Sequence, residues 1–401
     1  MSTSYRDLAH VPGFPRLALA TLLVRLGAAM SQLALVLFVL ATYRSAALAG
    51  IAVFLSVAPG IIVSPLAGAL LDRHGRVRLM IVDYSLSAAV LAAIVALAIA
   101  GALPLWLLLL LIGINSLGNP LGTTGGRTLF PLVVPRHLWD RANAIDSTGY
   151  AFTTILGAPL AGVIIAISRP ETALAVTALV FVVGALSLIG VREPALADRG
   201  TGILREALAG LRYVLGHRSL RSLALSVSIT NLAQGILVIA LPVLVLESLH
   251  GSSSLVGVLW AVMGVSGMAS GLVAGRLGSE GRERTFLIIG PLVVSLGCAV
   301  LAASANIGMV VVAVVILGLA AGPLDIGLFS LRQRVTDPAW FGRAFAVSMH
   351  LNYAGVPIGS AIGGPLVTAS VTLAFAVAVG FSLLAAAVTL LALPAGEARP
   401  V

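Results

Sequence analysis

The stretch GALLDRHGRVRLM, residues 68–80, carries four charges and a histidine within positions 72–78, and long apolar runs flank it on both sides. The run before it extends from about residue 47, and the run after it extends to about residue 101. Each is long enough to cross a bilayer core, which takes about 20 apolar residues. The stretch therefore predicts a short connection between two membrane-spanning helices.

The whole chain has the composition of a membrane protein. Of its 401 residues, 59% are hydrophobic and 10% are charged, whereas about a quarter of the residues of a soluble domain are charged. The apolar run after Arg6 and Arg16 is far longer than the core of a cleavable signal and has no convincing small-residue cleavage site, so we expect it to be retained. The predicted spans are 17–42, 47–70, 79–101, 104–126, 144–167, 172–191, 222–246, 254–274, 285–305, 308–330, 344–368 and 370–393.

The charge of the chain follows the sides of the membrane. The net charge is +9 and all 24 basic residues are arginine. Only Arg44 and Arg169 fall on one side, Arg25 lies within the first span, and the other 21 arginines fall on the opposite side. The positive-inside rule then places both termini and residues 68–80 in the cytoplasm of a multi-pass cell-membrane protein. Topology and attraction to anionic lipid headgroups account for the basic charge, so no nucleic-acid partner is predicted.

The chain repeats itself at half its length. Gln32 aligns with Gln234 and Arg141 with Arg343 at a shift of 202, residues 157–162 align with 359–364 at the same shift, and residues 68–75 align with 271–278 at 203. The repeat predicts two six-helix bundles, 1–191 and 222–401, joined by a cytoplasmic linker at 192–221 with a short amphipathic helix. Both bundles would have the same orientation, with a substrate site near the membrane midplane where they face each other. We expect a monomer.

Two motifs carry a family resemblance. The first is the loop with Gly68, Asp72, Arg73, Gly75, Arg76 and Arg78, which resembles the signature loop of the major facilitator superfamily and has a degenerate copy with Gly275 in place of the acid. The second is GAPLAG, residues 157–162, which resembles a motif common in the exporters of that superfamily, with Ala158 in place of the usual glycine. The resemblance covers the whole chain. It implies an all-α fold of twelve transmembrane helices in two pseudo-symmetric bundles, and transport by alternating access.

The signature loop is expected to act as a gate. Asp72 can pair with a cytoplasmic arginine or meet the positive N-terminus of a helix, and Gly75 permits a tight turn. The resemblance implies that the loop stabilises the outward-facing state. The alternative is a hairpin that only fixes orientation, although positive charge alone would do that without Asp72 or Gly75.

Amide side chains mark a candidate substrate cavity. Five of them, Gln32, Asn115, Asn119, Asn231 and Gln234, lie on the first, fourth and seventh spans, and a sixth, Asn352, lies on the eleventh. The resemblance implies that the first, fourth, seventh and tenth spans line the cavity. The alternative role is hydrogen bonding between helices, which contributes about 0.6 kcal/mol per contact in membranes.

Acids within spans are candidates for proton coupling. Asp325 is the deepest and lies on the tenth span, so we predict that it couples transport to protons. Asp83 and Asp146 lie close to cytoplasmic arginines and are predicted to be their interfacial partners. Arg25 either extends to the cytoplasm or points into the cavity.

Small residues and prolines predict a hinge or a close helix contact. They are Gly157, Pro159 and Gly162 on the fifth span, and Gly359 and Gly363 on the eleventh. Proline removes a helical hydrogen bond, and small residues let helices approach closely. A static bundle would tolerate the same residues.

The functional prediction is proton-coupled export of a small amphipathic organic compound. The alternatives are import of a small polar nutrient and a non-transporting membrane sensor. The chain has no phosphate-binding loop, no Cys/His cluster with metal-ligand spacing and no activated nucleophile. No enzymatic activity, cofactor or metal is therefore predicted.

Overall fold

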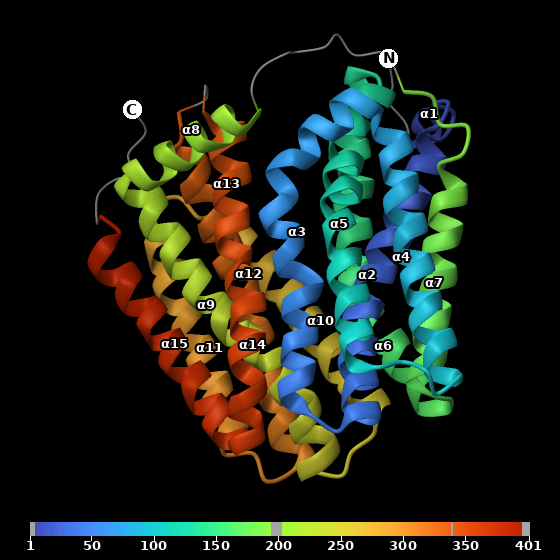
Figure 1. The fold of residues 1–401 in the computed structure, drawn as a ribbon. Coiled ribbons are helices and arrows are strands. Elements are labelled where there is room, and N and C mark those ends of the chain that lie inside the picture. The colour runs from blue at the N-terminus through green and yellow to red at the C-terminus, as the bar shows by residue number, and fades with distance from the viewer. Residues whose placement is uncertain (1–4, 194–202, 338–339, 395–401) are drawn as a thin grey trace. The chain divides into compact units, whose positions relative to one another are not determined.

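The computed structural model describes residues 5–193, 203–337 and 340–394, and all regular secondary structure in these ranges is helical (Figure 1). The elements are α1 (Tyr5–Ala9), α2 (Phe14–Tyr43), α3 (Ala46–His74), α4 (Arg76–Ile99), α5 (Leu105–Val133), the 3₁₀ turn η1 (Arg136–Leu138), α6 (Trp139–Ile167), α7 (Pro170–Ser187), α8 (Ile203–Gly216), α9 (Arg218–Val243), the π-helical turn η2 (Leu244–Ser248), α10 (Ser253–Leu277), α11 (Glu283–Ala302), α12 (Ile307–Val335), α13 (Phe341–Tyr353), α14 (Gly355–Ala369) and α15 (Val371–Ala392). Within these ranges, eleven helices are long and apolar enough to span a membrane. The predicted all-α membrane fold is confirmed.

The span predicted at 344–368 consists of two helices, α13 and α14, which meet at Ala354. Pro357 explains the interruption, because it has no amide N–H to bond the carbonyl of Tyr353. Ala354 keeps right-handed helical angles, φ −59° and ψ −24°, so the helical path continues through it. With 13 and 15 residues, neither helix is long enough alone, and together they form the eleventh span in chain order, which brings the total to twelve.

Local sequence signals fix several helix starts. The side chains of Ser252, Asn306 and Ser370 accept hydrogen bonds from the backbone amides three residues later, at 3.2, 3.1 and 3.4 Å. Pro170 occupies the first position of α7, where a missing amide costs nothing. Polar caps and proline therefore end the connections between spans.

The chain forms two compact units. Unit 1 comprises Met1–Phe38 and Leu55–Ile203, and unit 2 comprises Val39–Phe54 and Leu204–Val401. The start of α3 thus groups with unit 2. Gly50 explains this grouping, because a Cβ there would meet the carbonyl oxygen of Ser360 and would lie 3.2 Å from the amide nitrogen of Gly364.

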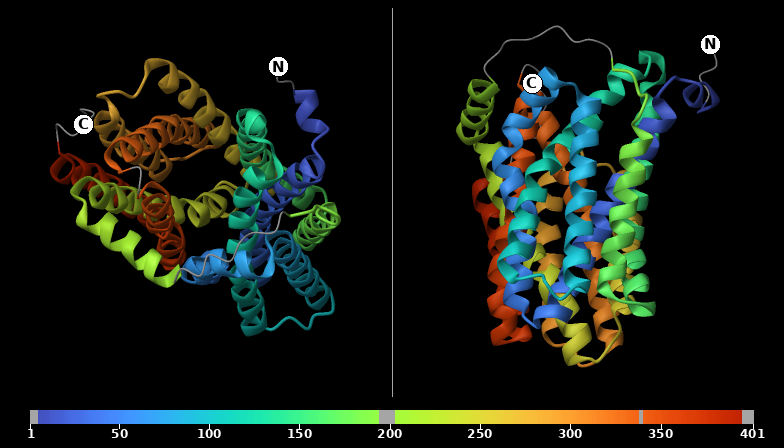
Figure 2. Two further views of the ribbon diagram at one scale, coloured as in Figure 1. Left: turned by 90° about the horizontal axis from the view of Figure 1, so that it is seen from above. Right: turned by 45° about the vertical axis from the view of Figure 1, so that its right-hand side comes forward.

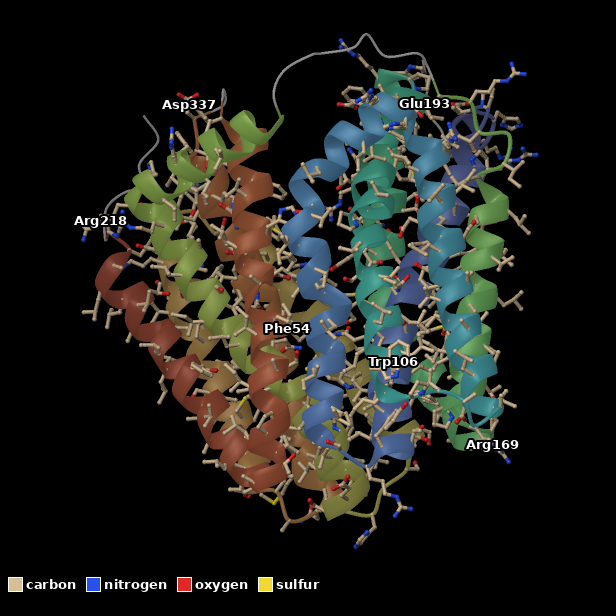
Figure 3. The ribbon with its side chains drawn as sticks, viewed as in Figure 1. Phe54, Trp106, Arg169, Glu193, Arg218 and Asp337 are labelled. Atoms are coloured by element: carbon tan, nitrogen blue, oxygen red, sulfur yellow. The ribbon has the colours of Figure 1, made fainter. Side chains whose placement is uncertain are left out.

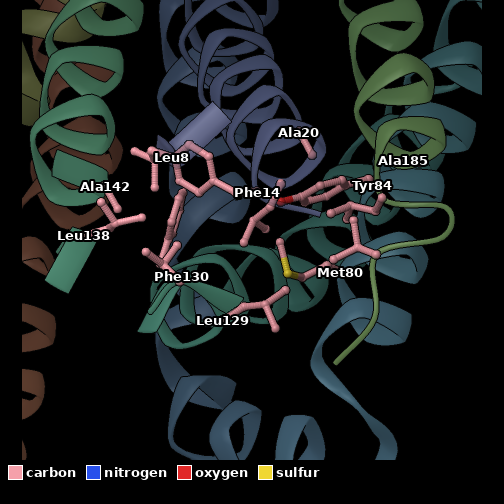
Figure 4. Close-up of a cluster of buried hydrophobic side chains, with 14 residues drawn as sticks. Leu8, Phe14, Ala20, Met80, Tyr84, Leu129, Phe130, Leu138, Ala142 and Ala185 are labelled. Atoms are coloured by element: carbon pink, nitrogen blue, oxygen red, sulfur yellow. The ribbon is translucent and has the colours of Figure 1, made fainter. Parts of the chain in front are cut away.

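In unit 1, α4 packs against α5 on one side and α7 on the other (Figure 2). Glu193 and Arg169 lie at opposite ends of this unit (Figure 3), and an apolar cluster that includes Val191 packs toward the end that carries Glu193. Phe14 and Phe130 meet edge to face in this cluster, with ring centroids 5.9 Å apart. The buried members shown in Figure 4 include Leu8, Phe14, Ala20, Met80, Tyr84, Leu129, Phe130, Leu138, Ala142 and Ala185.

In unit 2, α9 packs against α13, α14 and α15, while α12 packs against α10 and α11. The segment predicted to hold an amphipathic helix contains α8, whose Val214 is fully buried in the apolar cluster of this unit. Tyr213 stacks on Trp340 with ring centroids 5.0 Å apart, and its hydroxyl accepts a hydrogen bond from the amide of Asp337 at 3.1 Å. Helix α8 is therefore held by packing and by a specific polar contact.

Candidate functional site

The predicted gating loop is a helical corner. Helix α3 continues to His74 and α4 begins at Arg76, so Gly75 alone connects them. Gly75 has φ +88°, a conformation that favours glycine. The expected loop is not an extended connection, because Asp72 and Arg73 lie in the last turn of α3. Gly68 lies within α3, but its surroundings are outside the described part of the structure.

Arg76 is the centre of this corner and is buried, with 8% of its surface exposed. Its Nη2 pairs with Asp72, its Nη1 lies 2.9 Å from Oε1 of Glu193, and its Nε donates to the hydroxyl of Thr128 at 3.1 Å. Arg73 and Arg78 are exposed by contrast. One arginine of the cluster therefore ties together α3, α4, α5 and the chain after α7.

Glu193 was not singled out from the sequence. Its Oε2 accepts hydrogen bonds from the amides of Arg76 and Val77, at 2.7 and 3.2 Å. A carboxylate at a helix N-terminus satisfies free amides and opposes the positive end of the helix dipole. Asp72 was expected to be able to fill that position, but its side chain is 56% exposed and pairs with Arg76 instead. The available signal was an acid directly after Arg192, at the start of the predicted linker.

Unit 2 has its own ion pair, although its signature copy lacks the acid. Glu283, in the first turn of α11, is 1% exposed and lies 3.0 Å from Nε of Arg334. Glu280 is 3.5 Å from the same guanidinium. The first residue of α4 in unit 1 is the cation Arg76, whereas the first residue of α11 in unit 2 is the anion Glu283. The charges at these two helix starts are therefore opposite.

The predicted cavity amides belong to both units. Gln32, Asn115 and Asn119 lie in unit 1, where Gln32 and Asn119 are exposed. Asn231 and Gln234 lie in unit 2 and are half-buried. These exposures allow contact with a solute, and their role in a cavity stays a prediction.

Two of the amides also contact neighbouring helices. Nδ2 of Asn231 donates to the backbone carbonyl of Asn352 at 2.8 Å. Nδ2 of Asn119 lies 3.5 Å from the carbonyl of Ser56, which is a weak contact. Asn231 therefore has a structural partner, whereas Asn119 is held only loosely.

Arg25 pairs with Asp146 in unit 1. Its Nη1 lies 2.8 Å from Oδ1 and 3.0 Å from the backbone oxygen of Asp146, and its guanidinium lies over the ring of Tyr150. Both side chains are partly exposed, at 19% and 26%. Asp146 was predicted to partner a cytoplasmic arginine close to it in sequence; its partner is an arginine, but it is Arg25 of the first span, which thereby joins α2 to α6.

Arg332 lies two residues beyond the predicted span 308–330, so it was expected in a connection between spans. It is instead buried in the last turn of α12, with 1% of its surface exposed. Its guanidinium lies between the rings of Phe329 and Phe345, 5.8 and 5.3 Å from their centroids. With the Asn352 amide oriented toward it, Oδ1 of Asn352 accepts from Nη2 at 2.8 Å. No carboxylate of the described residues pairs with this cation. Arg332 belongs to the candidate site of unit 2 because Asn352 links it to Asn231.

The two remaining acids differ in their surroundings. Asp325 is exposed on α12, on the helix face that also carries Phe329 and Arg332. Asp83 was predicted to be an interfacial partner of an arginine, and this was wrong. It is 3% exposed, forms no ion pair among the described residues, and packs against the glycines of α5. The surroundings of Asp83 are therefore determined by the glycines of α5. Its closeness to Arg78 along the chain did not predict them.

The glycines of the predicted hinge lie at close helix contacts. A Cβ at Gly157 would meet the methyl group of Ala29 on α2, and a Cβ at Gly359 would meet the carbonyl oxygen of Leu232 on α9. A Cβ at Gly363 would lie 2.9 Å from Cα of Ile236. Gly162 is buried and Pro159 lies inside the continuous helix α6. The structure supports close packing at these positions, and bending there stays a prediction.

Comparisons with known proteins agree with this architecture. The model of the Major Facilitator Superfamily matches residues 17–278 and 223–401. A protein of Sinorhizobium fredii called "Uncharacterized MFS-type transporter y4rN" is 37% identical, over 99% of this chain and 98% of its own. The "Multidrug efflux pump Tap" of Mycobacterium tuberculosis is 27% identical, over 88% of this chain and 86% of its own.

Among solved structures, the nucleoside transporter NupG, as a mutant, superposes with a TM-score of 0.78 at 14% identity, covering 94% of this chain and 98% of its own. At this identity the likeness shows the fold alone. The predicted layout of twelve spans in two bundles is confirmed.

Proposed function

Because the chain belongs to the Major Facilitator Superfamily and is a multi-pass membrane transporter of that family, we propose that it exports a small amphipathic organic compound in exchange for protons. The observation that carries the proposal is the exposure of polar side chains within spans, which are the neutral amides Gln32 and Asn119 in unit 1 and the acid Asp325 in unit 2. Neutral amides together with an acid suit an amphipathic solute that is uncharged or carries a single positive charge, and an accessible acid in a span can bind a proton. The name of the relative Tap, a multidrug efflux pump, supports the direction of transport.

The proposal assigns a role to each feature. The five amides bind the substrate, and Asp325 binds and releases the proton for which the substrate is exchanged. The corner around Arg76 stabilises one state of the transport cycle. The close contacts at Gly157 and Gly359 are where helices bend or slide. The protein would act as a monomer in the cell membrane, with both termini in the cytoplasm, as the distribution of arginines indicates.

Transport by the purified protein in liposomes tests this proposal. Ethidium is the first probe, and we expect an imposed proton gradient to raise its accumulation about tenfold over vesicles without a gradient, as a coupling of about 1.4 kcal/mol would give. Uridine tests the alternative of nutrient import, since the fold neighbour is a nucleoside transporter. Equal ethidium transport with and without the gradient would refute proton coupling, and uridine uptake would favour import. A growth screen of an expressing strain against a panel of antibiotics and dyes would then identify substrates.

Replacing Gln32 or Gln234 with leucine should weaken substrate binding. Loss of one hydrogen bond to a bound solute costs about 1 kcal/mol, which corresponds to roughly a fivefold rise in KM. The measurement is the concentration dependence of ethidium transport, and Ser85→Ala, at an exposed position on a different helix, α4, serves as the control. Unchanged KM in both amide variants for every transported compound would remove these residues from the binding surface.

A further inference from the structure

Asp83 occupies a cleft that two glycines of α5 provide. A Cβ at Gly118 would lie 2.5 Å from Oδ1 of Asp83, and a Cβ at Gly122 would meet Oδ2. The carboxyl is 3% exposed, so the two helices close directly over it. Any side chain larger than hydrogen at either glycine position would push α4 and α5 apart.

The carboxyl is poorly satisfied in this cleft. Oδ1 has no hydrogen-bond partner, and the hydroxyl of Ser87, one turn further along α4, has none either. The backbone of Gly122 is the polar group that interacts with the carboxyl. Burying an ionised carboxylate without a partner costs several kcal/mol, whereas a neutral carboxylic acid costs much less. The closed packing of α4 and α5 therefore suits the protonated form.

The charged and titratable groups around Asp83 do not neutralise it. Tyr84 is its neighbour, with Cε1 2.8 Å from a Cβ placed on Gly122. The charged residue of α5 is Arg127, which is exposed, and that of α7 is Glu171 in its first turn. On α2, Arg25 is already paired with Asp146, and Arg76 at the start of α4 is held by Asp72 and Glu193.

Packing alone does not require an acid at this position. In unit 2, the corresponding pair of helices, α11 and α12, has a comparable close approach at Gly327. There the side chains that approach are apolar, with Cβ of Phe286 3.1 Å and Cγ of Leu287 3.3 Å from a Cβ placed on the glycine, beside the backbone oxygen of Glu283 at 3.2 Å. A leucine-like residue would fill the cleft of unit 1 at a lower cost than a carboxyl.

Helix α5 also has a means of moving away from Asp83. Pro120 lies between the two glycines and removes the helical hydrogen bond to the carbonyl of Ser116. Gly60 on α3 packs against that same carbonyl. Proline is a frequent cause of helix bending, so a bend here would open the cleft to water.

The geometry points to Asp83 as a proton-binding site whose protonation closes α4 onto α5 and whose deprotonation opens the cleft. This inference rests on the proposed proton-coupled transport and adds to it a second proton-binding acid, on a different helix and in a different unit from Asp325. Proton binding in unit 1 would thereby be converted into helix movement.

Infrared difference spectroscopy of the full-length protein in lipid tests proton binding without a transport assay. Stepping the buffer from acidic to alkaline should remove a carbonyl band of a protonated carboxylic acid. We expect the Asp83 component of this band to be absent from Asp83→Asn, while any component from Asp325 remains, and the whole band to be present in the control Glu247→Gln, which alters an exposed acid. Asp83→Leu is a second non-titrating variant in case the asparagine variant misfolds. A band unchanged in both Asp83 variants would overturn the inference.

Two glycine-to-alanine variants of α5 test whether proton binding by Asp83 depends on the packing of α4 against α5. Gly122→Ala should shift the pH at which the band disappears, because the added methyl group meets Oδ2 of Asp83 and Tyr84. Gly113→Ala on the same helix has no atom within 4 Å of the added group and should leave the titration unchanged. Identical titrations for the two variants would contradict the coupling.

Ethidium transport then separates this inference from the proposed function. We expect Asp83→Asn to lose about tenfold in gradient-driven accumulation while exchange of ethidium at equilibrium changes by less than about twofold. If the wild-type protein ignores the proton gradient, the proposed coupling fails, and the infrared band still decides whether Asp83 binds a proton. If the band depends on Asp83 but gradient-driven transport does not, the role of Asp83 in coupling is refuted.

Discussion

Replacing Gly359 with valine should leave little correctly folded protein. A Cβ at this position would meet the carbonyl oxygen of Leu232 and lie 2.8 Å from its Cα, so the obstacle is the backbone of α9. A backbone inside a helix cannot shift locally, in contrast to the end of a flexible side chain. We expect a loss of roughly 3 kcal/mol or more in the free energy of unfolding, at the upper end for overpacked cores.

The contact at Gly359 is part of a longer seam, which makes relief by a small rotation of α14 ineffective. Gly355, one turn before, is as close to the carbonyl oxygen of Ser228, and a Cβ at Gly363, one turn after, would lie 2.9 Å from Cα of Ile236. Gly235 on α9 is close to Ser360 in return. Thermal unfolding in detergent and the yield of monodisperse protein measure the effect. Gly380→Val, on α15, is the matched control, because nothing lies within 4 Å of its added Cβ. Equal stability of the two variants would show that the seam is looser than described.

Replacing Arg76 with alanine should be the most damaging single change in the charged corner. It removes the partner of Asp72 and Glu193 and leaves the Glu193 carboxylate, 16% exposed, without its cation. Breaking a buried ion pair from one side typically costs about 3–5 kcal/mol, and we expect the low end here because Glu193 keeps the backbone amides of α4. Transport should fall together with stability.

Arg78→Ala provides the control for Arg76, because it removes the same charge from the same helix turn at an exposed position. We expect it to change stability by less than about 0.5 kcal/mol. Denaturant titration of both variants, with ethidium transport measured in parallel, gives the comparison. If the two variants behave alike, Arg76 serves only to orient the chain in the membrane.

The layout of the spans could be predicted because it depends on local properties. The length of an apolar run fixes a span, and glycine, proline or a polar cap fixes its end, as at Gly75, Pro170 and Ser252. The interruption of the eleventh span was not predicted, since residues 344–368 were expected to form one span although they contain Pro357. Tertiary packing decides whether a proline bends a helix or divides it.

The partners of the charged residues could not be predicted in the same way. Glu193 lies 117 residues from Arg76 along the chain, and no periodicity joins the two positions. Asp83 and Asp146 lie at the same distance from an arginine in sequence, yet one is enclosed by glycines of α5 and the other pairs with Arg25. Depth in a span follows from counting residues, but the surroundings of a side chain depend on the helix opposite it.

The division of the eleventh span at Ala354 changes the number of spans that would be counted from helix length alone. Such a count gives eleven spans, an odd number, and would put the two ends of the polypeptide on opposite faces of the membrane. Joining α13 and α14 restores an even number, for which both ends are expected on the same face. A reporter fused to the C-terminus is therefore expected to give the same compartment signal as one fused to the N-terminus, and Pro357 changes only the parity of a count made by helix length.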